Sequence, residues 1–175
     1  MAEAARISSA QKAGRAGYDL EDVKVTFTGD VSTSVSGTDV SGREGDVLNL
    51  PRWVARALEE GGHARVDEPS MEPELKQAIS KENGMDDYQL ASLDDHFYVR
   101  VQAHLERAPQ QKREELGSML NSLVRSRVSK IARLVISSKL SAANAEKLTI
   151  EERSLYEQMR AAHDEFVAHA TGGTA

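Results

Sequence analysis

The segment from Leu116 to Leu140 constrains the fold more than any other part of the chain, because it combines a wide apolar stripe with a row of cations. At about 100° per residue, its large aliphatic side chains fall on one face of a single amphipathic helix. The residues on this face are Leu116, Met119, Leu120, Leu123, Val124, Val128, Ile131, Leu134 and Val135. Full burial of one such side chain contributes about 1.5 to 3 kcal/mol, so this face is the largest single source of folding or association free energy in the sequence. We therefore expect other helices to cover it.

The same segment carries five cations and no acidic residue, although the whole chain has a net charge of −6. These cations are Arg125, Arg127, Lys130, Arg133 and Lys139. Helical spacing puts Arg127 inside the apolar stripe and Lys130 at its edge, and leaves the other three in solvent. An unpaired buried charge costs several kcal/mol, so Arg127 requires carboxylate or carbonyl partners on another element. This pattern is typical of helices in larger assemblies.

We therefore predict a subunit interface on this helix, with its two inner cations paired to carboxylates across the interface. The predicted interface residues are Leu120, Leu123, Val124, Arg127, Lys130, Ile131 and Leu134.

The N-terminal half has a different periodicity, in which β-branched and polar residues alternate with period two, as in strands. The expected strands are 23–28, 31–35, 47–50 and 63–66. Pro51 is suited to the first turn of a short helix that continues to Glu60, and Gly61-Gly62 is expected to end it. The core of this region is expected to contain Leu50, Pro51, Trp53 and Leu58. Trp53 could instead be an exposed anchor for a partner.

The C-terminal half is predicted to be helical on both sides of the central segment. Apolar residues recur every three or four positions from Leu90 to Leu105, and Ser92 is expected to cap that helix. Asn144 is expected to close the central helix. Thr149 and Glu152 form a capping box that opens the last helix.

These patterns predict an α+β fold, with a small N-terminal β-rich domain followed by a C-terminal α-helical bundle domain. The expected divisions are a flexible tail at 1–17, the β-rich domain at 18–68, a linker at 69–88 and the helical domain at 89–170. The linker has room for one or two helical turns near 74–80.

The sequence shows no residues that would carry catalysis. The chain has no cysteine, and none of its histidines stands three or four positions from another. Adjacent carboxylates, such as Asp86-Asp87 and Asp94-Asp95, point to different faces of a helix. Gly61-Gly62 lacks the Lys-Ser/Thr of a phosphate loop. We expect no catalytic residue, no cofactor, no metal ion and no membrane span, and a cytoplasmic location.

Four stretches, in order, resemble the subunits of the GINS complex of DNA replication. The first is the run from Val47 to Ala55 followed by Leu58 and Gly61-Gly62, which resembles the small GINS β domain. Residues 92–98 resemble the start of the first long helix of the GINS helical domain. The run from Arg127 to Ile131 is similar to the Arg-x-x-Lys-apolar motif of its central helix, and 148–152 to the start of its last helix.

The resemblance implies a non-enzymatic scaffold with the GINS-type fold. Because the β-rich domain comes first, the implied partner is a helical-domain-first GINS subunit, in a heterotetramer. The resemblance further implies contacts with the MCM helicase and a RecJ-like protein at the nucleoid-associated replication fork, and the compact chain indicates an archaeal source. The alternative is an accessory protein that binds nucleic acid weakly through the basic central helix and the N-terminal tail, with affinity falling steeply with salt.

Overall fold

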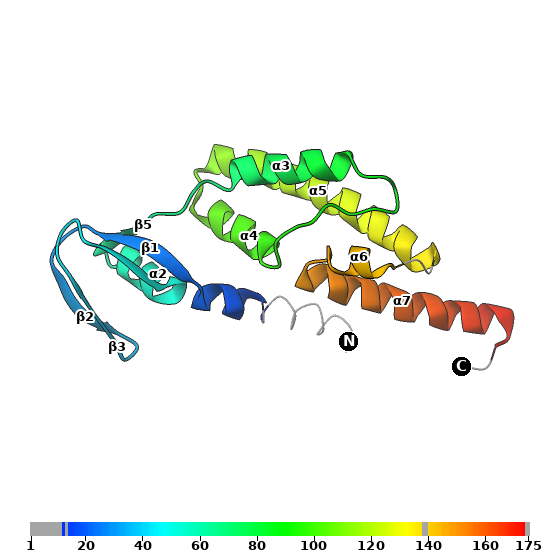
Figure 1. Ribbon diagram of the computed structural model, residues 1–175, viewed down its shortest axis with the longest axis horizontal. Coiled ribbons are helices and arrows are strands. Elements are labelled where there is room, and N and C mark those ends of the chain that lie inside the picture. The colour runs from blue at the N-terminus through cyan, green and yellow to red at the C-terminus, as the bar shows by residue number, and fades with distance from the viewer. Residues whose placement is uncertain (1–11, 13, 138–139, 174–175) are drawn as a thin grey trace. The chain divides into compact units, whose positions relative to one another are not determined.

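The computed structural model describes residues 12, 14–137 and 140–173, and the chain divides into two compact units. The first unit, Arg15–Pro69, is called the β unit here. The second, which comprises Ser70–Ala175 together with the residues before Arg15, is called the helical unit. In Figure 1 the β unit runs from blue to cyan and the helical unit from green to red.

The chain is helical over residues 14–20, where the last part of a flexible tail was expected. Apart from Lys12, the earlier part of that predicted tail lies outside the described residues. Tyr18 explains the order, because its ring is 2% exposed and the guanidinium of Arg52 lies 3.9 Å from the ring centroid. The hydroxyl of Tyr18 donates to Glu68, which also pairs with Arg52. This contact anchors the segment in the β unit.

The β unit contains a three-stranded antiparallel sheet in the order β4-β1-β5. Its strands are β1 (Asp22–Phe27), β4 (Val47–Pro51) and β5 (Ala64–Val66). A separate hairpin is formed by β2 (Val31–Val35) and β3 (Thr38–Gly42), and β3 was not predicted. Ser36 and Gly37 form its two-residue turn with φ values of 47° and 87°. Two positive φ values match the twist of a tight hairpin turn. The chain therefore reverses direction at Ser36-Gly37, and residues 38–42 form a strand.

Helix α2 (Arg52–Glu60) covers one face of this sheet and begins directly after Pro51, as expected. The core of the β unit consists of Val23, Val25, Phe27, Val31, Val40, Val54, Ala55, Leu58 and Ala64. Leu50 and Trp53 are partly buried and pack against this core. Trp53 therefore contributes to the interior of the β unit.

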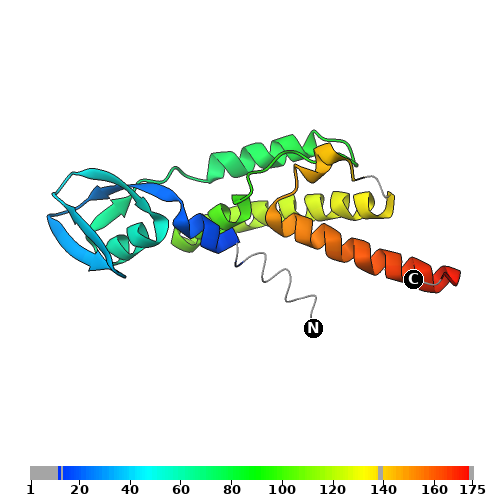
Figure 2. The same ribbon diagram turned by 60° about the horizontal axis from the view of Figure 1, so that its bottom comes forward.

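The helical unit is built around one long helix, α5 (Gln110–Ser137). The others are α3 (Glu72–Asn83), α4 (Phe97–Arg107), the short α6 (Ala142–Ala145) and α7 (Ile150–Thr171). Figures 1 and 2 show α3 and α7 along different sides of α5. The long central helix thus supplies the surface on which the other helices of the unit pack.

Helix α3 is the main correction to the predicted organisation, because it fills the segment assigned to a linker. It is twelve residues long, where one or two turns were expected. Met71, Leu75 and Ala78 are buried in a cluster with Leu116 and Leu123 of α5. Their spacing of four and three residues is that of a helix face, which the acidic and proline-rich composition obscured.

Two other helix ends also differ from prediction. Helix α5 is described to Ser137, and Asn144, which was expected to close it, lies in α6. Helix α4 begins at Phe97, five residues after the expected cap Ser92. The residues before it form an irregular segment in which Leu90 is completely buried with Ile131 and Leu134. The predicted capping box is confirmed, because Glu152 N–H donates to the Thr149 hydroxyl and Thr149 N–H donates to the Glu152 carboxylate.

Candidate functional site

The most distinctive site in the helical unit is a buried ionic network centred on Arg127 of α5, a residue that is 0% exposed. All five of its N–H donors are used. Nε and Nη2 donate to the two oxygens of Glu152, with Nη2 at 2.7 Å. Nη1 donates to Glu82 at 2.7 Å and to the carbonyl of Ala91 at 2.8 Å, and Nη2 also donates to the carbonyl of Lys147. Arg127 therefore joins α3, α5 and α7. Through Ala91 and Lys147 it also holds the segment between α3 and α4 and the segment between α6 and α7.

Glu82 and Lys130 extend this network at the end of α3. Lys130 Nζ lies 2.9 Å from one carboxylate oxygen of Glu82 and donates to the backbone carbonyls of Glu82 and Met85. A cation at these carbonyls satisfies acceptors that the helix end leaves free. Glu82 also accepts from the backbone N–H of Ala91. Two carboxylates and two cations thus make a neutral buried cluster.

Besides Arg127, three features stabilise the charge of Glu152: the N-terminus of α7, the hydroxyl of Tyr98 and the capping box. Its position in the first turn of α7 is favourable for a negative charge, because helix N-termini carry partial positive charge. The hydroxyl of Tyr98 in α4 donates to it at 2.6 Å, and the capping box adds the contacts with Thr149. Tyr98 therefore brings α4 into the same network.

The network changes the proton affinities of two of its members. Burial by itself lowers the pKa of Arg127, but the hydrogen bonds and charge of Glu152 outweigh burial and raise the pKa above its ordinary value. Burial raises the pKa of Tyr98, and the neighbouring charge of Glu152 raises it further. Arg127 therefore stays charged, and Tyr98 stays a neutral hydrogen-bond donor.

The network separates two apolar clusters along α5. The first contains Leu116 and Leu123, together with residues of α3 and α4. The second contains Ile131 and Leu134, with Leu90 and Leu148. Apolar contacts alone would tolerate a shift of one helix along another. We infer that the directional bonds of Arg127, which lies between the clusters, fix the register of the bundle.

Alkaline titration should detect the buried hydroxyl of Tyr98. Its pKa is raised in the folded protein and is about 10 when unfolded, so its contribution to stability is complete below pH 10 and is lost as pH rises above that value. Above pH 10 we expect the free energy of unfolding to fall less steeply in Tyr98→Phe than in the unaltered protein. Urea unfolding at a series of pH values measures the two slopes. Equal pH slopes for the two proteins would contradict this placement.

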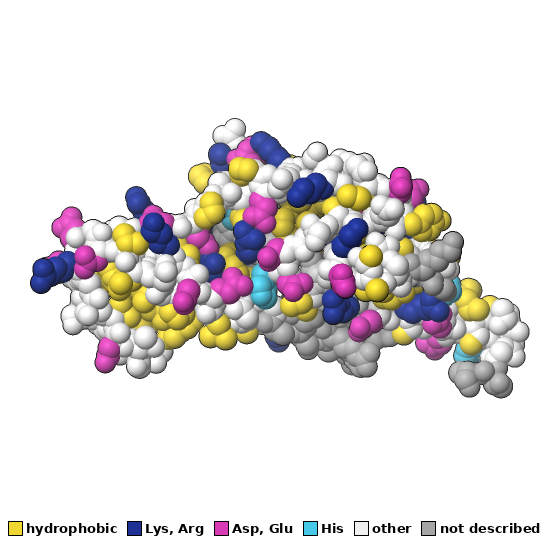
Figure 3. Space-filling view, viewed as in Figure 1, with side chains coloured by type: hydrophobic (Ala, Val, Ile, Leu, Met, Phe, Trp, Pro, Cys, Tyr) yellow, Lys and Arg dark blue, Asp and Glu magenta, His cyan; other side chains and the backbone are white. Residues whose placement is uncertain are grey.

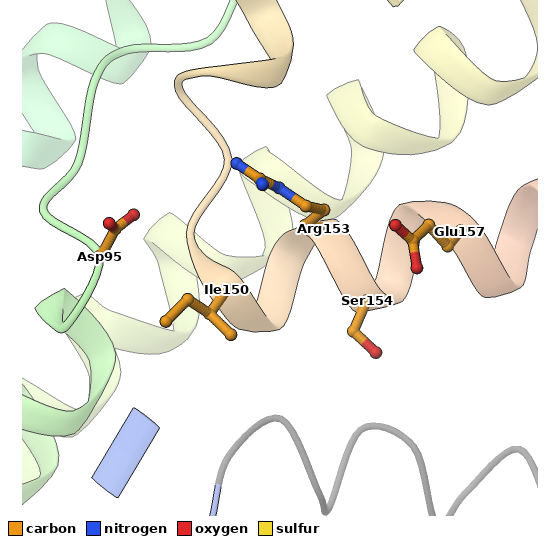
Figure 4. A pocket seen from close by; sticks show the side chains of 5 residues that line it. All are labelled: Asp95, Ile150, Arg153, Ser154 and Glu157. Carbon is orange, nitrogen blue, oxygen red and sulfur yellow. The ribbon is translucent and has the colours of Figure 1, made fainter. Parts of the chain in front are cut away.

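The network has no open position for a substrate, because the donors of Arg127 are already occupied within the chain. A shallow surface hollow lies nearby and is lined by Asp95, Ile150, Arg153, Ser154 and Glu157. Figure 4 shows Asp95 on the segment before α4 and the other four residues on α7, with the two carboxylates at opposite sides of the hollow. They do not form an acid and base pair. Among the described residues, no group of three histidine, aspartate or glutamate side chains could hold a metal ion.

Five of the seven residues predicted to form a subunit interface on α5 are buried within the chain itself. Leu123, Arg127, Lys130, Ile131 and Leu134 are at most 7% exposed within this chain. Side chains buried in this way have little surface left for a partner, and the carboxylates predicted to come from another subunit are Glu82 and Glu152 of the same chain. Leu120 and Val124 remain partly exposed.

The cations of the central segment do not form a free basic face. Arg127 and Lys130 are buried, and Arg133 pairs with Asp87. Arg125 is exposed, and Lys139 lies outside the described residues. The hypothesis of nucleic-acid binding through a basic central helix is therefore not favoured by the described part of α5.

Sequence reasoning anticipated Arg127 but missed its partners. Glu82 was assigned to a linker, although it continues the spacing of Leu75 and Ala78 on α3. Glu152 was predicted as a cap and is also an ion-pair partner. Tyr98 was noted only as part of a motif. Continuation of the α3 pattern was the one signal that could have located a carboxylate partner.

Comparison with protein families identifies the helical unit. The model of the GINS complex protein helical bundle domain, Sld5, matches residues 70–169, which is more than half of the chain. The chain belongs to the GINS family. The predicted GINS-type fold, with a strand-rich N-terminal region before the helical bundle, is confirmed. No curated protein shows significant sequence similarity to the chain.

Membership of the GINS family makes the chain a subunit of a multi-subunit complex of DNA replication. The matched region begins at residue 70, so it includes α3 and carries all four charged members of the Arg127 network. The family is a non-catalytic component of that complex. In the described part of this GINS subunit, no helix combines the length and apolar character needed to cross a membrane.

Proposed function

We propose that this GINS subunit binds a helical-domain-first GINS subunit in a heterotetramer, and that the assembly joins the MCM helicase to a RecJ-like protein at the replication fork. The role is structural: the helical unit supplies rigid surfaces, and the Arg127 network keeps its helices in register. The observation that carries the proposal is the apolar surface that the helical unit leaves uncovered after its own core is complete.

One such surface is the outer stripe of α5, defined as Gly117, Leu120, Val124 and Val128. Leu120 and Val124 are partly exposed and Val128 is 37% exposed. Beyond its own helix backbone and chain neighbours, no described atom lies within 4 Å of the point where Gly117 would carry a Cβ atom. Glycine inside a helix costs roughly 1 kcal/mol relative to alanine, and no described neighbour requires it. An open glycine beside aliphatic side chains permits close approach of a helix from another subunit.

The free end of α7 is a second uncovered surface. Phe166 is 72% exposed and Val167 is 40% exposed, whereas Tyr156 and Met159 pack against the cluster around Ile131. Figure 3 shows apolar side chains on the protruding end of this helix. An exposed phenylalanine on a protruding helix is suited to a pocket in a partner, where aromatic anchors supply much of the binding free energy.

Co-expression with a helical-domain-first GINS subunit tests the assembly directly. Native mass spectrometry should show two copies of each subunit. The interfaces of such an obligate complex are expected to bury a few thousand Å² in total. A cooperatively folded monomer that does not associate with that subunit would overturn the proposal.

Substitution in the outer stripe should separate assembly from folding. Val128→Lys places a charge in the proposed interface and should weaken association by about 2 kcal/mol or more, roughly 30-fold. Its thermal unfolding should change little, because Val128 is partly exposed in the chain itself. Ser129→Lys is the matched control, since Ser129 is exposed and one position outside the stripe. Equal association of the two variants would argue against this surface.

Contacts with the MCM helicase and the RecJ-like protein are supported by the GINS motifs of the sequence and by family membership. They are best tested with the assembled heterotetramer, since the isolated chain would expose surfaces that assembly covers. Pull-down of each partner by the heterotetramer is expected, with loss of both when Val128→Lys prevents assembly. Retention of either partner by unassembled Val128→Lys would contradict a role that depends on the complex.

A further inference from the structure

The strand β4 leaves one edge of the β unit's sheet open. It pairs with β1 on one side only, at the end of the order β4-β1-β5. Edge strands in natural proteins are usually protected by lysine, proline or a covering element, because their free backbone groups can pair with another strand. The β4 sequence is VLNLP, which has no charged residue and a proline only at its last position.

The hydrogen bonds of the ladder show which groups point outward. Phe27 N–H donates to the carbonyl of Asp46, and Arg52 N–H donates to the carbonyl of Glu21. Paired residues in an antiparallel ladder alternate between those that exchange hydrogen bonds and those that do not. The backbone groups of Val47 and Asn49 therefore face away from β1. Among the described residues, no hydrogen bond to either outward N–H or carbonyl is present.

The opposite edge of the sheet is closed. On β5, the outward N–H of Val66 donates to the side chain of Glu59 in α2 at 3.1 Å. Ala64, the other outward residue, is 5% exposed. The contrast shows that α2 covers one edge of this sheet and leaves the other available.

Strand β4 also has exposed apolar side chains on both faces of the sheet. Leu48 pairs with Val25, so it lies on the core face of the sheet, yet it is 39% exposed. Val47 lies on the other face and is 48% exposed. Figure 3 shows a gathering of apolar side chains on the visible face of this unit. A further strand beside β4 would extend the core face over Leu48.

The charge of the β unit indicates what kind of strand would bind. Residues 15–69 contain eleven acidic and six basic residues, a net charge of −5, so most of the chain's total of −6 lies in this unit. A field of one sign favours a partner of the opposite sign and speeds its association.

We propose that β4 binds an extended, basic segment of another protein, which adds to the sheet as a fourth strand beside Val47 and Asn49. Main-chain hydrogen bonds supply the binding, and alternating apolar side chains of the segment cover Leu48. This surface lies in the β unit and does not involve α5 or α7, so its role goes beyond subunit assembly.

The test uses the full chain and a short synthetic peptide of alternating lysine and valine, about nine residues long, a common strand length. We expect saturable binding and at least tenfold slower hydrogen exchange at the N–H groups of Val47 and Asn49, measured by nuclear magnetic resonance. Saturable binding without this protection would overturn the proposal, as would no binding. A peptide of alternating glutamate and valine should bind at least tenfold more weakly, and equal affinity would overturn the assignment of a basic partner.

Two matched changes separate backbone pairing from general attraction. Asn49→Pro removes the outward N–H and should weaken peptide binding at least tenfold, whereas Asn49→Ala retains that group and should bind as the unaltered protein does. Equal binding by the two variants would overturn strand addition. If Asn49→Pro fails to fold, backbone pairing is tested on the unaltered protein with a lysine-valine peptide methylated at alternate amide nitrogens. If this peptide binds as tightly as its unmethylated form, strand addition is also overturned.

Discussion

Arg127→Ala should destabilise the isolated chain by about 3 to 5 kcal/mol, the cost of removing one partner from a buried ion pair. The substitution leaves Glu82 and Glu152 with only Lys130 for compensation, so the interior acquires an excess negative charge. It also leaves the buried carbonyl of Ala91 without the Arg127 hydrogen bond. Urea unfolding followed by circular dichroism measures the loss, and unchanged slopes in urea would show that the unfolded states are comparable.

Arg133→Ala is the control on the same helix. Arg133 also carries a positive charge and also pairs with a carboxylate, but its side chain is 43% exposed and that of its partner Asp87 is 69% exposed. Solvent-exposed pairs contribute from about zero to 1 kcal/mol, so this variant should be close to neutral. Similar losses for the two variants would contradict the burial of Arg127.

The comparison between sequence and structure shows what a helical pattern can establish. The spacing around Arg127 correctly required a buried cation with carboxylate partners, because the cost of an isolated charge does not depend on where the partners come from. It could not locate those partners. Glu82 and Glu152 lie 45 and 25 positions from Arg127, and their approach depends on how α3 and α7 pack.

The same limit applies to the predicted interface. An apolar stripe must be covered, but its sequence does not distinguish a helix of the same chain from a helix of a partner. The missed helix α3 covers much of this stripe, with Leu75 and Ala78 packed in the cluster that contains Leu116 and Leu123. The apolar surface of α5 that stays partly exposed once α3 is present is the outer stripe, where Leu120 and Val124 belonged to the original prediction and Gly117 did not.

The period-two pattern of the sequence also could not predict the hairpin of β2 and β3 or the open edge of β4. The sequence 38–42 alternates poorly because the hairpin of β2 and β3 has little core of its own, with Val40 as its buried residue on β3. The turn at Ser36-Gly37 indicates the hairpin more clearly than the alternation of residues 38–42 does, since two residues with positive φ are characteristic of a tight hairpin. Likewise, alternation predicted β4 as a strand but could not show that its outer edge lacks a neighbour.

The double variant Arg127→Met with Glu152→Gln should be more stable than the sum of its single variants predicts, by about 2 kcal/mol or more. Arg127→Met alone leaves two carboxylates and one cation, and Glu152→Gln alone leaves two cations and one carboxylate, so each single variant buries a net charge. The double variant leaves Lys130 with Glu82, which is neutral. Glutamine also retains an acceptor for Thr149 N–H and Tyr98.

The coupling follows from the difference between breaking a buried ion pair and removing it completely. One orphaned charge is strongly destabilising, whereas replacement of the whole pair by groups of similar volume is often nearly neutral. A double-mutant cycle on the free energy of unfolding measures the coupling, and residues in contact commonly give 0.5 to 3 kcal/mol, roughly the expected range. Additive losses would mean that Arg127 and Glu152 act independently, and the register of α7 on α5 would then have to come from the apolar clusters on either side.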